Sequence, residues 1–192
     1  PYALLNPPHS KFVGQMLENN RWMEKQGRRV VRKLGMPSFH GHDRAKVIRA
    51  TIGNEQWDEM FTFGFVRNPW DWQVSLYHYT LKFEDHHQHE LIKGMKDFDE
   101  YIDWRVNHDL KLQSEAFIDN SRKVIVDFIG KMENLEEDFA KITSAIGLND
   151  VKLPHSNKSK HKKYTEYYTP RTRKLIADHF AEDIERFKYT FE

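Results

Sequence analysis

The 192-residue chain contains no cysteine, so it cannot build a disulfide framework and needs no oxidising compartment. It has no apolar run of the roughly 18 to 20 residues that a membrane-spanning helix requires, and no signal-peptide pattern. Its formal net charge is only +1, which argues against a globally basic nucleic-acid binder. These absences favour a soluble, cytoplasmic protein.

The residues that are present are sufficient for a folded core. Hydrophobic residues make up 39% of the chain and aromatic residues 14%. A chain of this length buries most of its surface on folding and lies within the size range of one domain. We therefore expect a single domain over residues 1–192.

The most informative segment covers residues 61–79 and reads FTFGFVRNPWDWQVSLYHY. Its first six residues alternate aromatic and small side chains and end in Val66, a pattern typical of a buried strand. Asn68 is a preferred helix N-cap, and Pro69 suits the first helical position because that position needs no N–H donor. The sequence therefore predicts a strand that ends directly at the start of a helix.

This junction has the properties of an anion site. A helix N-terminus carries partial positive charge and unsatisfied N–H donors, and Arg67 adds a full charge with a geometry suited to phosphate. Ser75, about two turns further along, supplies a hydroxyl donor. The alternative is an ordinary joint between a strand and a helix, with Arg67 as a surface residue.

Local patterns elsewhere predict further strands and helices. Capping residues and helical spacing indicate a helix that ends at Gly53, another that follows Asp97 and a third that is closed by Gly147. The expected elements are a strand at residues 2–5, helices at 14–25 and 43–51, a loop at 83–96, a helix carrying residues 98–106, a strand at 124–129, a helix carrying residues 135–146, and one final helix that begins at Thr169-Pro170 and carries residues 175–187. Strands that alternate with helices predict a parallel sheet with helices on both faces.

Arg67-Asn68-Pro69, with a serine eight residues after the arginine, resembles the 3′-phosphate-binding motif of sulfotransferases that use 3′-phosphoadenosine 5′-phosphosulfate (PAPS). The segments VIVDFIGKMENLEEDF and LPHSNKSKHKKYTEYYTPRTRKLIADHFAEDIERFKYTF resemble the C-terminal half of the carbohydrate-type sulfotransferases, which include heparan sulfate 2-O-sulfotransferase and bacterial relatives. The resemblance covers most of residues 36–192.

This resemblance implies an α/β three-layer P-loop-like fold with a central parallel sheet flanked by helices. It implies transfer of a sulfuryl group from PAPS to a hydroxyl, with 3′-phosphoadenosine 5′-phosphate (PAP) as product and no metal. Arg67 and Ser75 would hold the 3′-phosphate. A carbohydrate is the acceptor that the family favours, although a lipid or a small-molecule alcohol fits the same chemistry. A cytoplasmic protein of bacterial or phage-like type is expected, or a Golgi-lumen protein if the chain is the catalytic domain of an anchored relative.

The loop that wraps the 5′-phosphosulfate in relatives has the form Pro-Lys-Thr-x-Gly-Thr-Ser. Here residues 8–16 read PHSKFVGQM, in which Lys11 and Gly14 keep the spacing while Gln15 and Met16 replace the Thr-Ser pair. By resemblance, Lys11 would stabilise the bridging oxygen as the S–O bond breaks. The alternative is that Lys11 is a surface lysine and the chain a degenerate relative, which binds nucleotide or glycan without turnover.

Two histidines resemble the His-Gly-His segment of heparan sulfate 2-O-sulfotransferase. The resemblance assigns the general base to His42, with His40 assisting, because histidine is the usual base near neutral pH. Since the chain has eleven histidines, the alternative for each is a structural or surface role.

The basic loop over residues 153–164 reads LPHSNKSKHKKY. By resemblance, Asn157, Lys158 and Ser159 would fold over the donor, because cationic loops neutralise phosphates. Lys162 and Lys163 fit a solvated charge run better.

Other patterns are weaker. His86, His87 and His89 suggest a metal site, but adjacent histidines without a defined partner spacing favour a surface or acceptor-side loop. Trp70, Trp72 and Trp104 are at helical positions that favour the core over a sugar-binding face. A nucleoside-type kinase is disfavoured because the chain has no Gly-Lys-Ser/Thr loop.

Overall fold

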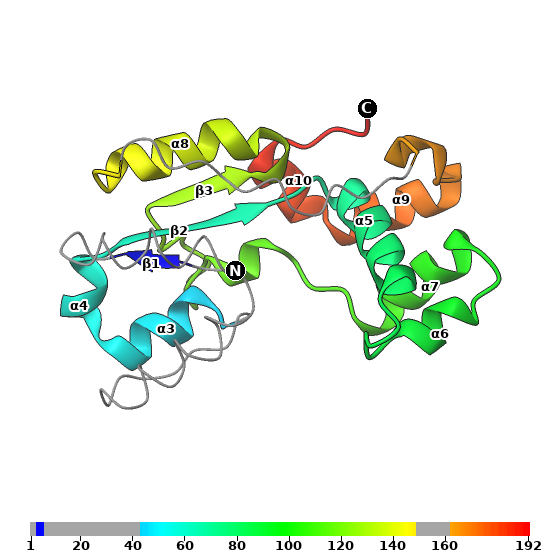
Figure 1. Ribbon diagram of the computed structural model, residues 1–192, viewed down its shortest axis with the longest axis horizontal. Helices are drawn as coiled ribbons and strands as arrows, with labels where there is room; N and C mark the ends of the chain where they lie inside the picture. The colour runs from blue at the N-terminus through cyan, green and yellow to red at the C-terminus, as the bar shows by residue number, and fades with distance from the viewer. Residues whose placement is uncertain (1–2, 6–42, 149–161) are drawn as a thin grey trace. The chain divides into compact units, whose positions relative to one another are not determined.

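A computed structural model of the protein describes residues 3–5, 43–148 and 162–192 (Figure 1). The chain divides into two compact units: a sheet unit of Pro1–Val66 and Ser114–His155, and a helical unit of Arg67–Gln113 and Ser156–Glu192. The expected helix at 14–25 lies outside the described residues, as do the predicted site residues Lys11, Gly14, His40, His42, Asn157, Lys158 and Ser159.

Among its described residues, the sheet unit has three strands in the order β1-β2-β3: β1 (Ala3–Leu5), β2 (Phe61–Val66) and β3 (Phe128–Lys131). Strands β2 and β3 run parallel, from the pair Phe63 and Phe128 to the pair Val66 and Lys131, which confirms the parallel pairing expected there. Strand β1 pairs antiparallel with β2, so the expectation of a wholly parallel sheet is wrong at this edge. The chain has a mixed α/β architecture.

Strand β3 begins four residues later than the apolar run that predicted it. Val124 forms only an isolated bridge with Ile118. Asp127 then interrupts the apolar run, because its Oδ2 accepts hydrogen bonds from the backbone N–H and the hydroxyl of Thr62, both at 2.7 Å. Regular pairing with β2 starts immediately after this polar contact.

The described part of the sheet unit includes the helices α3 (Ala45–Ile52), α4 (Asn54–Asp58) and α8 (Leu135–Ala145). Gly53 ends α3 with a φ of 91°, which confirms the predicted cap, and at the same time begins α4, which the sequence did not predict. Buried Ala45, Ile48 and Trp57 form a small core with Ile125 and Val126. Helix α8 packs on β3 (Figure 1).

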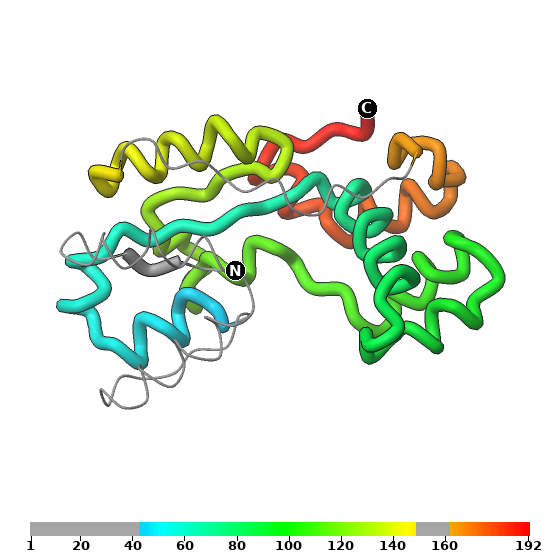
Figure 2. Tube along the Cα trace, viewed as in Figure 1, coloured from blue at the N-terminus to red at the C-terminus, as the bar shows by residue number. Residues whose placement is uncertain are grey.

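The helical unit contains α5 (Pro69–Lys82), α6 (His89–Lys93), α7 (Phe98–His108), α9 (Pro170–His179) and α10 (Ala181–Phe187). Figure 2 shows the short links by which α5, α6 and α7 follow one another. The loop expected at 83–96 therefore contains a short helix, and the final helix is two helices that meet at buried Phe180. The core consists of buried residues from four of these helices and the link at 180: Trp70, Val74, Ile92, Phe98, Tyr101, Ile102, Ile176 and Phe180.

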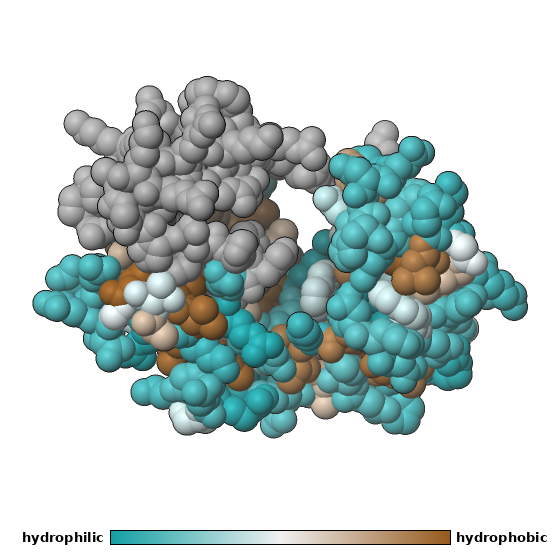
Figure 3. All heavy atoms as spheres, turned by 90° about the horizontal axis from the view of Figure 1, so that it is seen from below, coloured by the Kyte–Doolittle hydropathy of each residue, from teal (hydrophilic) through white to brown (hydrophobic). Residues whose placement is uncertain are grey.

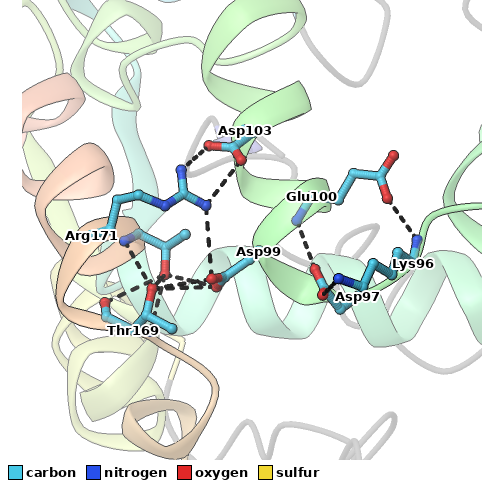
Figure 4. A network of polar contacts seen from close by, with 8 residues as sticks. Lys96, Asp97, Asp99, Glu100, Asp103, Thr169 and Arg171 are labelled. Carbon is cyan, nitrogen blue, oxygen red and sulfur yellow. Dashed lines mark hydrogen bonds and ion pairs between the residues drawn. The ribbon is translucent and has the colours of Figure 1, made fainter.

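A polar network fixes α7 against the start of α9 (Figure 4). Arg171 binds Asp103 through two hydrogen bonds of 2.5 and 3.0 Å. Asp99 accepts hydrogen bonds from the hydroxyls of Thr169 and Thr172 at 3.2 and 3.1 Å. Thr169 and Thr172 also form a capping box, which confirms the predicted start of the helix at Thr169-Pro170.

The surface of the helical unit is mainly hydrophilic. On the face shown in Figure 3, teal side chains predominate and the apolar ones form separate patches. The most exposed large apolar side chains of this unit are Tyr79 and Leu91, each 49% exposed. Of the helices in the described ranges, none has the length and apolar character needed to cross a bilayer.

Candidate functional site

The junction between β2 and α5 forms as the sequence predicts. Strand β2 ends at Val66, and α5 begins at Pro69 after the N-cap Asn68. The Asn68 side-chain oxygen accepts a hydrogen bond of 3.1 Å from the backbone N–H of Trp70. The cap satisfies one free donor of the first turn, and the remaining partial positive charge of the helix end stays beside Arg67.

The first turn of α5 is tied to the C-terminal segment of the chain. The side-chain nitrogen of buried Asn68 donates to the carbonyl of Thr190 at 2.8 Å. The indole N–H of Trp70 donates to the carbonyl of Arg173 at 3.0 Å, and the Tyr168 hydroxyl donates to the carbonyl of Trp70 at 2.8 Å. Burial raises the pKa of Tyr168 well above its ordinary value, so this hydroxyl keeps its proton. These contacts give the helix end a fixed position within the helical unit.

Arg67 is half-buried and paired within its own segment. Its Nε lies 2.6 Å from Oδ2 of Asp71, four residues later in the first turn of α5. The side chains of Arg67 and Asp71 are 26% and 21% exposed. Within the described ranges this bond is the only side-chain hydrogen bond of Arg67. The two terminal guanidinium nitrogens therefore have donors available for an anion.

Gln113 binds the backbone of Arg67 on both sides. Its side-chain oxygen accepts from the Arg67 N–H at 2.9 Å, and its side-chain nitrogen donates to the Arg67 carbonyl at 2.8 Å. The backbone N–H of Gln113 donates in turn to Oδ2 of Asp183 at 2.6 Å. The Asp183 side chain is fully buried in the first turn of α10.

Ser75 lies on α5, one turn beyond Asp71 and two turns from the start of the helix. Residues four apart share a helix face, so the spacing places Asp71 and Ser75 on one side of α5. The Ser75 side chain is partly exposed, and its hydroxyl makes no hydrogen bond to any residue in the described part of the chain. This arrangement suits an anion that is held by a guanidinium, a helix end and a hydroxyl.

Comparison with known proteins agrees with the anion site that the geometry indicates. A model of the sulfotransferase family matches residues 10–190. The chain belongs to the sulfotransferase family. The match covers both compact units and the strand–helix junction with Arg67, and it supports sulfuryl transfer as the general activity.

This family member also resembles an uncharacterised protein of Archaeoglobus fulgidus. The two are 37% identical over 112 residues, which cover 54% of this chain and 82% of that protein. No solved structure matches the chain. The carbohydrate-type subgroup, PAPS as the donor and the acceptor class remain predictions.

The three histidines that suggested a metal site, His86, His87 and His89, are not arranged around a common point. His89 is buried, and its Nδ1 lies 2.9 Å from the carbonyl of Thr80. The His86 and His87 rings lie side by side on the preceding turn, and burial together with His87 lowers the pKa of His86. Among the residues described, no group of three His, Asp or Glu side chains is arranged to hold a metal ion.

Trp70, Trp72 and the outer lysines follow the simpler interpretation, whereas Trp104 is half-buried and does not belong to the core of the helical unit. Trp70 is 4% exposed and belongs to the core, Trp72 packs against that core, and Trp104 stacks on His108. Lys162 and Lys163 are exposed, as a solvated charge run requires.

Sequence reasoning missed Asp71 and Gln113, which bind Arg67, and Asp183, which binds Gln113. Asp71 is four residues after the arginine, and this spacing is a recognisable signal for an ion pair on a helix. Gln113 and Asp183 carry no comparable signal, because they are 46 and 70 residues away from their partners along the chain. Only the folded helical unit brings them to Arg67.

Proposed function

We propose that this sulfotransferase-family protein transfers a sulfuryl group from PAPS to a hydroxyl of an acceptor, with a carbohydrate as the favoured acceptor class. The observation that carries the proposal is the guanidinium edge of Arg67, which no other residue in the described ranges engages, at the capped N-terminus of α5 and within the segment that matches the family. Such a site selects for phosphate because charge, dipole and hydrogen-bond donors converge.

Arg67 and Ser75 take the 3′-phosphate of the donor in this proposal. Arg67 supplies the charge and a planar pair of donors, and Ser75 supplies a hydroxyl with no competing partner in the described part of the chain. The 3′-phosphate distinguishes PAPS and PAP from ordinary adenine nucleotides. Recognition at this position therefore determines which nucleotide binds.

The remaining roles follow the family resemblance. His42, assisted by His40, takes the proton from the acceptor hydroxyl, whose oxygen attacks the sulfur in line with the leaving phosphate oxygen. A new S–O bond forms as the bridging S–O bond breaks, and Lys11 stabilises the charge that develops on the bridging oxygen. Asn157, Lys158 and Ser159 close over the donor, and Gly14 lets the loop backbone approach the phosphosulfate. The products are PAP and a sulfate ester.

A second candidate function is binding without turnover. Gln15 and Met16 replace the Thr-Ser pair of the phosphosulfate loop, so the donor loses two hydroxyl ligands at the reacting end. The 3′-phosphate site of the helical unit is separate from this loop in sequence. A degenerate relative would keep nucleotide affinity and lose transfer.

Calorimetric titration of the protein with PAP, and with adenosine 5′-monophosphate (AMP) as the nucleotide without a 3′-phosphate, tests the donor site. We expect PAP to bind more tightly than AMP. Arg67→Ala should weaken PAP binding at least about tenfold, because a charge-assisted hydrogen bond contributes about 1.5–3 kcal/mol. AMP binding should change little.

Arg186→Ala is the matched control. Arg186 is 29% exposed and pairs with Glu182 at an i,i+4 spacing on α10, as Arg67 does with Asp71 on α5. We expect this variant to bind PAP like the wild type. Equal affinity of the wild type and Arg67→Ala for PAP would remove the proposed donor site.

Transfer of a labelled sulfuryl group from PAPS to a panel of carbohydrates, lipids and small alcohols distinguishes the two candidate functions. His42→Ala should bind PAP almost normally and lose transfer. Full activity of His42→Ala would assign the base to another residue. Tight PAP binding by a wild type that transfers to no acceptor would favour the non-catalytic relative.

A further inference from the structure

Arg67 stands immediately after the end of the ladder between β2 and β3. The last parallel pair is Val66 with Lys131, so Arg67 follows the regular strand. The side-chain amide of Gln113 satisfies both backbone groups of Arg67, at 2.9 Å for the N–H and 2.8 Å for the carbonyl. The Gln113 side chain therefore supplies the two hydrogen bonds that a neighbouring strand would otherwise make to the Arg67 backbone.

Two reciprocal hydrogen bonds restrict Arg67 more than one bond would. They fix the peptide planes before and after its Cα, and these planes determine the direction of the Cα–Cβ bond. The guanidinium lies several bonds from Cα, so a small rotation of the backbone moves the charged group by a large part of a hydrogen-bond length. Both bonds also remain within the helical unit.

Gln113 is itself held in place. Its backbone N–H donates to Asp183 at 2.6 Å, and the Asp183 carboxylate is fully buried. Breaking a charge-assisted hydrogen bond to a buried carboxylate costs much free energy, so this bond fixes the position of the Gln113 backbone. The result is a chain of support from α10 through Gln113 to Arg67.

We infer that Gln113 is a positioning residue, which holds the Arg67 backbone so that the guanidinium is presented to the 3′-phosphate. The inference rests on the proposed function. Each polar atom of the Gln113 side chain has a hydrogen bond to the Arg67 backbone, so the effect argued here is one that Gln113 exerts through Arg67.

Gln113→Met tests this inference, because methionine keeps the length and approximate volume of glutamine and loses both hydrogen bonds. We expect PAP to bind roughly five- to twentyfold more weakly, and AMP to bind within about twofold of the wild type. A merely structural role would weaken both nucleotides alike. Gln56→Met, at an exposed glutamine of α4, is the control and should bind both nucleotides like the wild type.

A double variant separates positioning from a general loss of structure. If Gln113 acts only through Arg67, then Gln113→Met should cost no further PAP affinity once Arg67→Ala is present. Additive losses would contradict the inference. If Arg67→Ala weakens PAP binding and Gln113→Met does not, the inference fails while the proposed function stands. If Arg67→Ala has no effect, the proposed function fails first.

Gln113→Glu provides a test that does not depend on the methionine variant folding. A protonated glutamic acid has one donor and one acceptor in the same places as glutamine, whereas the carboxylate has no donor for the Arg67 carbonyl. The PAP affinity of Gln113→Glu relative to the wild type should therefore rise as the pH falls toward about 4.3. A ratio that is constant with pH would overturn the inference.

Discussion

The carboxylate of Asp71 holds the Nε side of Arg67, and no other described residue makes a hydrogen bond to the terminal nitrogens of the guanidinium. The Nε to Oδ2 distance is 2.6 Å, and both side chains are about one quarter exposed or less, at 26% and 21%. Asp71 stands in the first turn of α5, where a negative charge is stabilised by the helix dipole. The same carboxylate orients the arginine and also lowers the positive potential that an incoming phosphate meets.

These two effects of Asp71 can be separated by substitution. Asn keeps an oxygen that accepts from Arg67 Nε but removes the charge, so Asp71→Asn should bind PAP as tightly as the wild type or up to about threefold more tightly. Asp71→Ala removes the oxygen as well and should bind PAP several-fold more weakly, because Arg67 loses its orientation. Calorimetric titration with PAP at low and moderate salt measures the affinities of both variants. Equal affinities of the two variants would show that orientation by Asp71 is unimportant.

The sequence predicted best those features that are determined within a few residues. Asn68-Pro69, Asp97 and Thr169-Pro170 each begin a helix in the structure, and the side chains of Asn68, Asp97 and Thr169 accept the expected backbone hydrogen bonds. Gly53 adopts the positive φ expected of a C-terminal cap. Capping depends on local donors and acceptors, so it can be read without the tertiary fold.

Features determined by distant contacts were not predicted. The final helix divides at Phe180, whose side chain is fully buried, so tertiary packing overrides the continuous apolar pattern. The antiparallel direction of β1 is not encoded in its side-chain alternation, which is the same for either direction. For the candidate site, the sequence predicted Arg67 and its helix end but contained no signal for the support from Gln113.

Asp138 should make the stability of the sheet unit depend on pH. Burial raises the pKa of this carboxyl, but the Lys131 backbone N–H at 2.8 Å and the Lys141 ammonium at 2.9 Å outweigh burial and hold the pKa below its ordinary value of 3.8. A lowered folded-state pKa contributes stability above the unfolded-state pKa, and this contribution is lost as the pH falls through the folded-state pKa.

The variant Asp138→Asn should therefore lower the free energy of unfolding by about 1 kcal/mol at pH 7, and the difference should shrink as the pH falls below the ordinary pKa of 3.8. Urea unfolding of wild type and variant between pH 2.5 and 7 measures it. Glu137→Gln is the control, because Glu137 pairs with the same Lys141 at 2.8 Å but is 71% exposed. A difference between wild type and Asp138→Asn that persists unchanged at low pH would contradict this assignment.

Gly64 provides a test of close packing inside β2. A Cβ at this position would overlap the ring of Phe117, which covers the strand. Gly64→Ala should therefore destabilise the protein by about 1–3 kcal/mol, as overpacking in a core does. Gly94→Ala is the matched control, because the nearest atom there is a carbonyl oxygen at 3.4 Å. Thermal unfolding compares the stabilities of the two variants. Equal stabilities would show that the Phe117 ring moves aside at little cost in free energy.

The network between α7 and α9 allows a comparison of buried and exposed contacts (Figure 4). The Thr172 hydroxyl is buried, donates to Asp99 at 3.1 Å and accepts from the backbone N–H of Thr169 at 3.1 Å. The bonds of Arg171 to Asp103 are shorter, but the Arg171 side chain is 55% exposed. Removing the hydroxyl contact should lower the free energy of unfolding more, because it leaves polar groups unsatisfied in a buried position. When an exposed ion pair is lost, water hydrates the remaining charge, and salt already screens the pair.

Thr172→Val should consequently lower the free energy of unfolding by about 1–2 kcal/mol at any salt concentration, since the isosteric side chain leaves the Thr169 N–H without its partner and removes one of the two hydroxyl donors to the Asp99 carboxylate. Thr165→Val is the control, because that hydroxyl makes no hydrogen bond within the described ranges. Arg171→Gln should have a smaller effect that fades as salt is added. If Arg171→Gln proved the more destabilising variant at high salt, the geometry of the ion pair rather than the burial of the hydroxyl would hold α7 to α9.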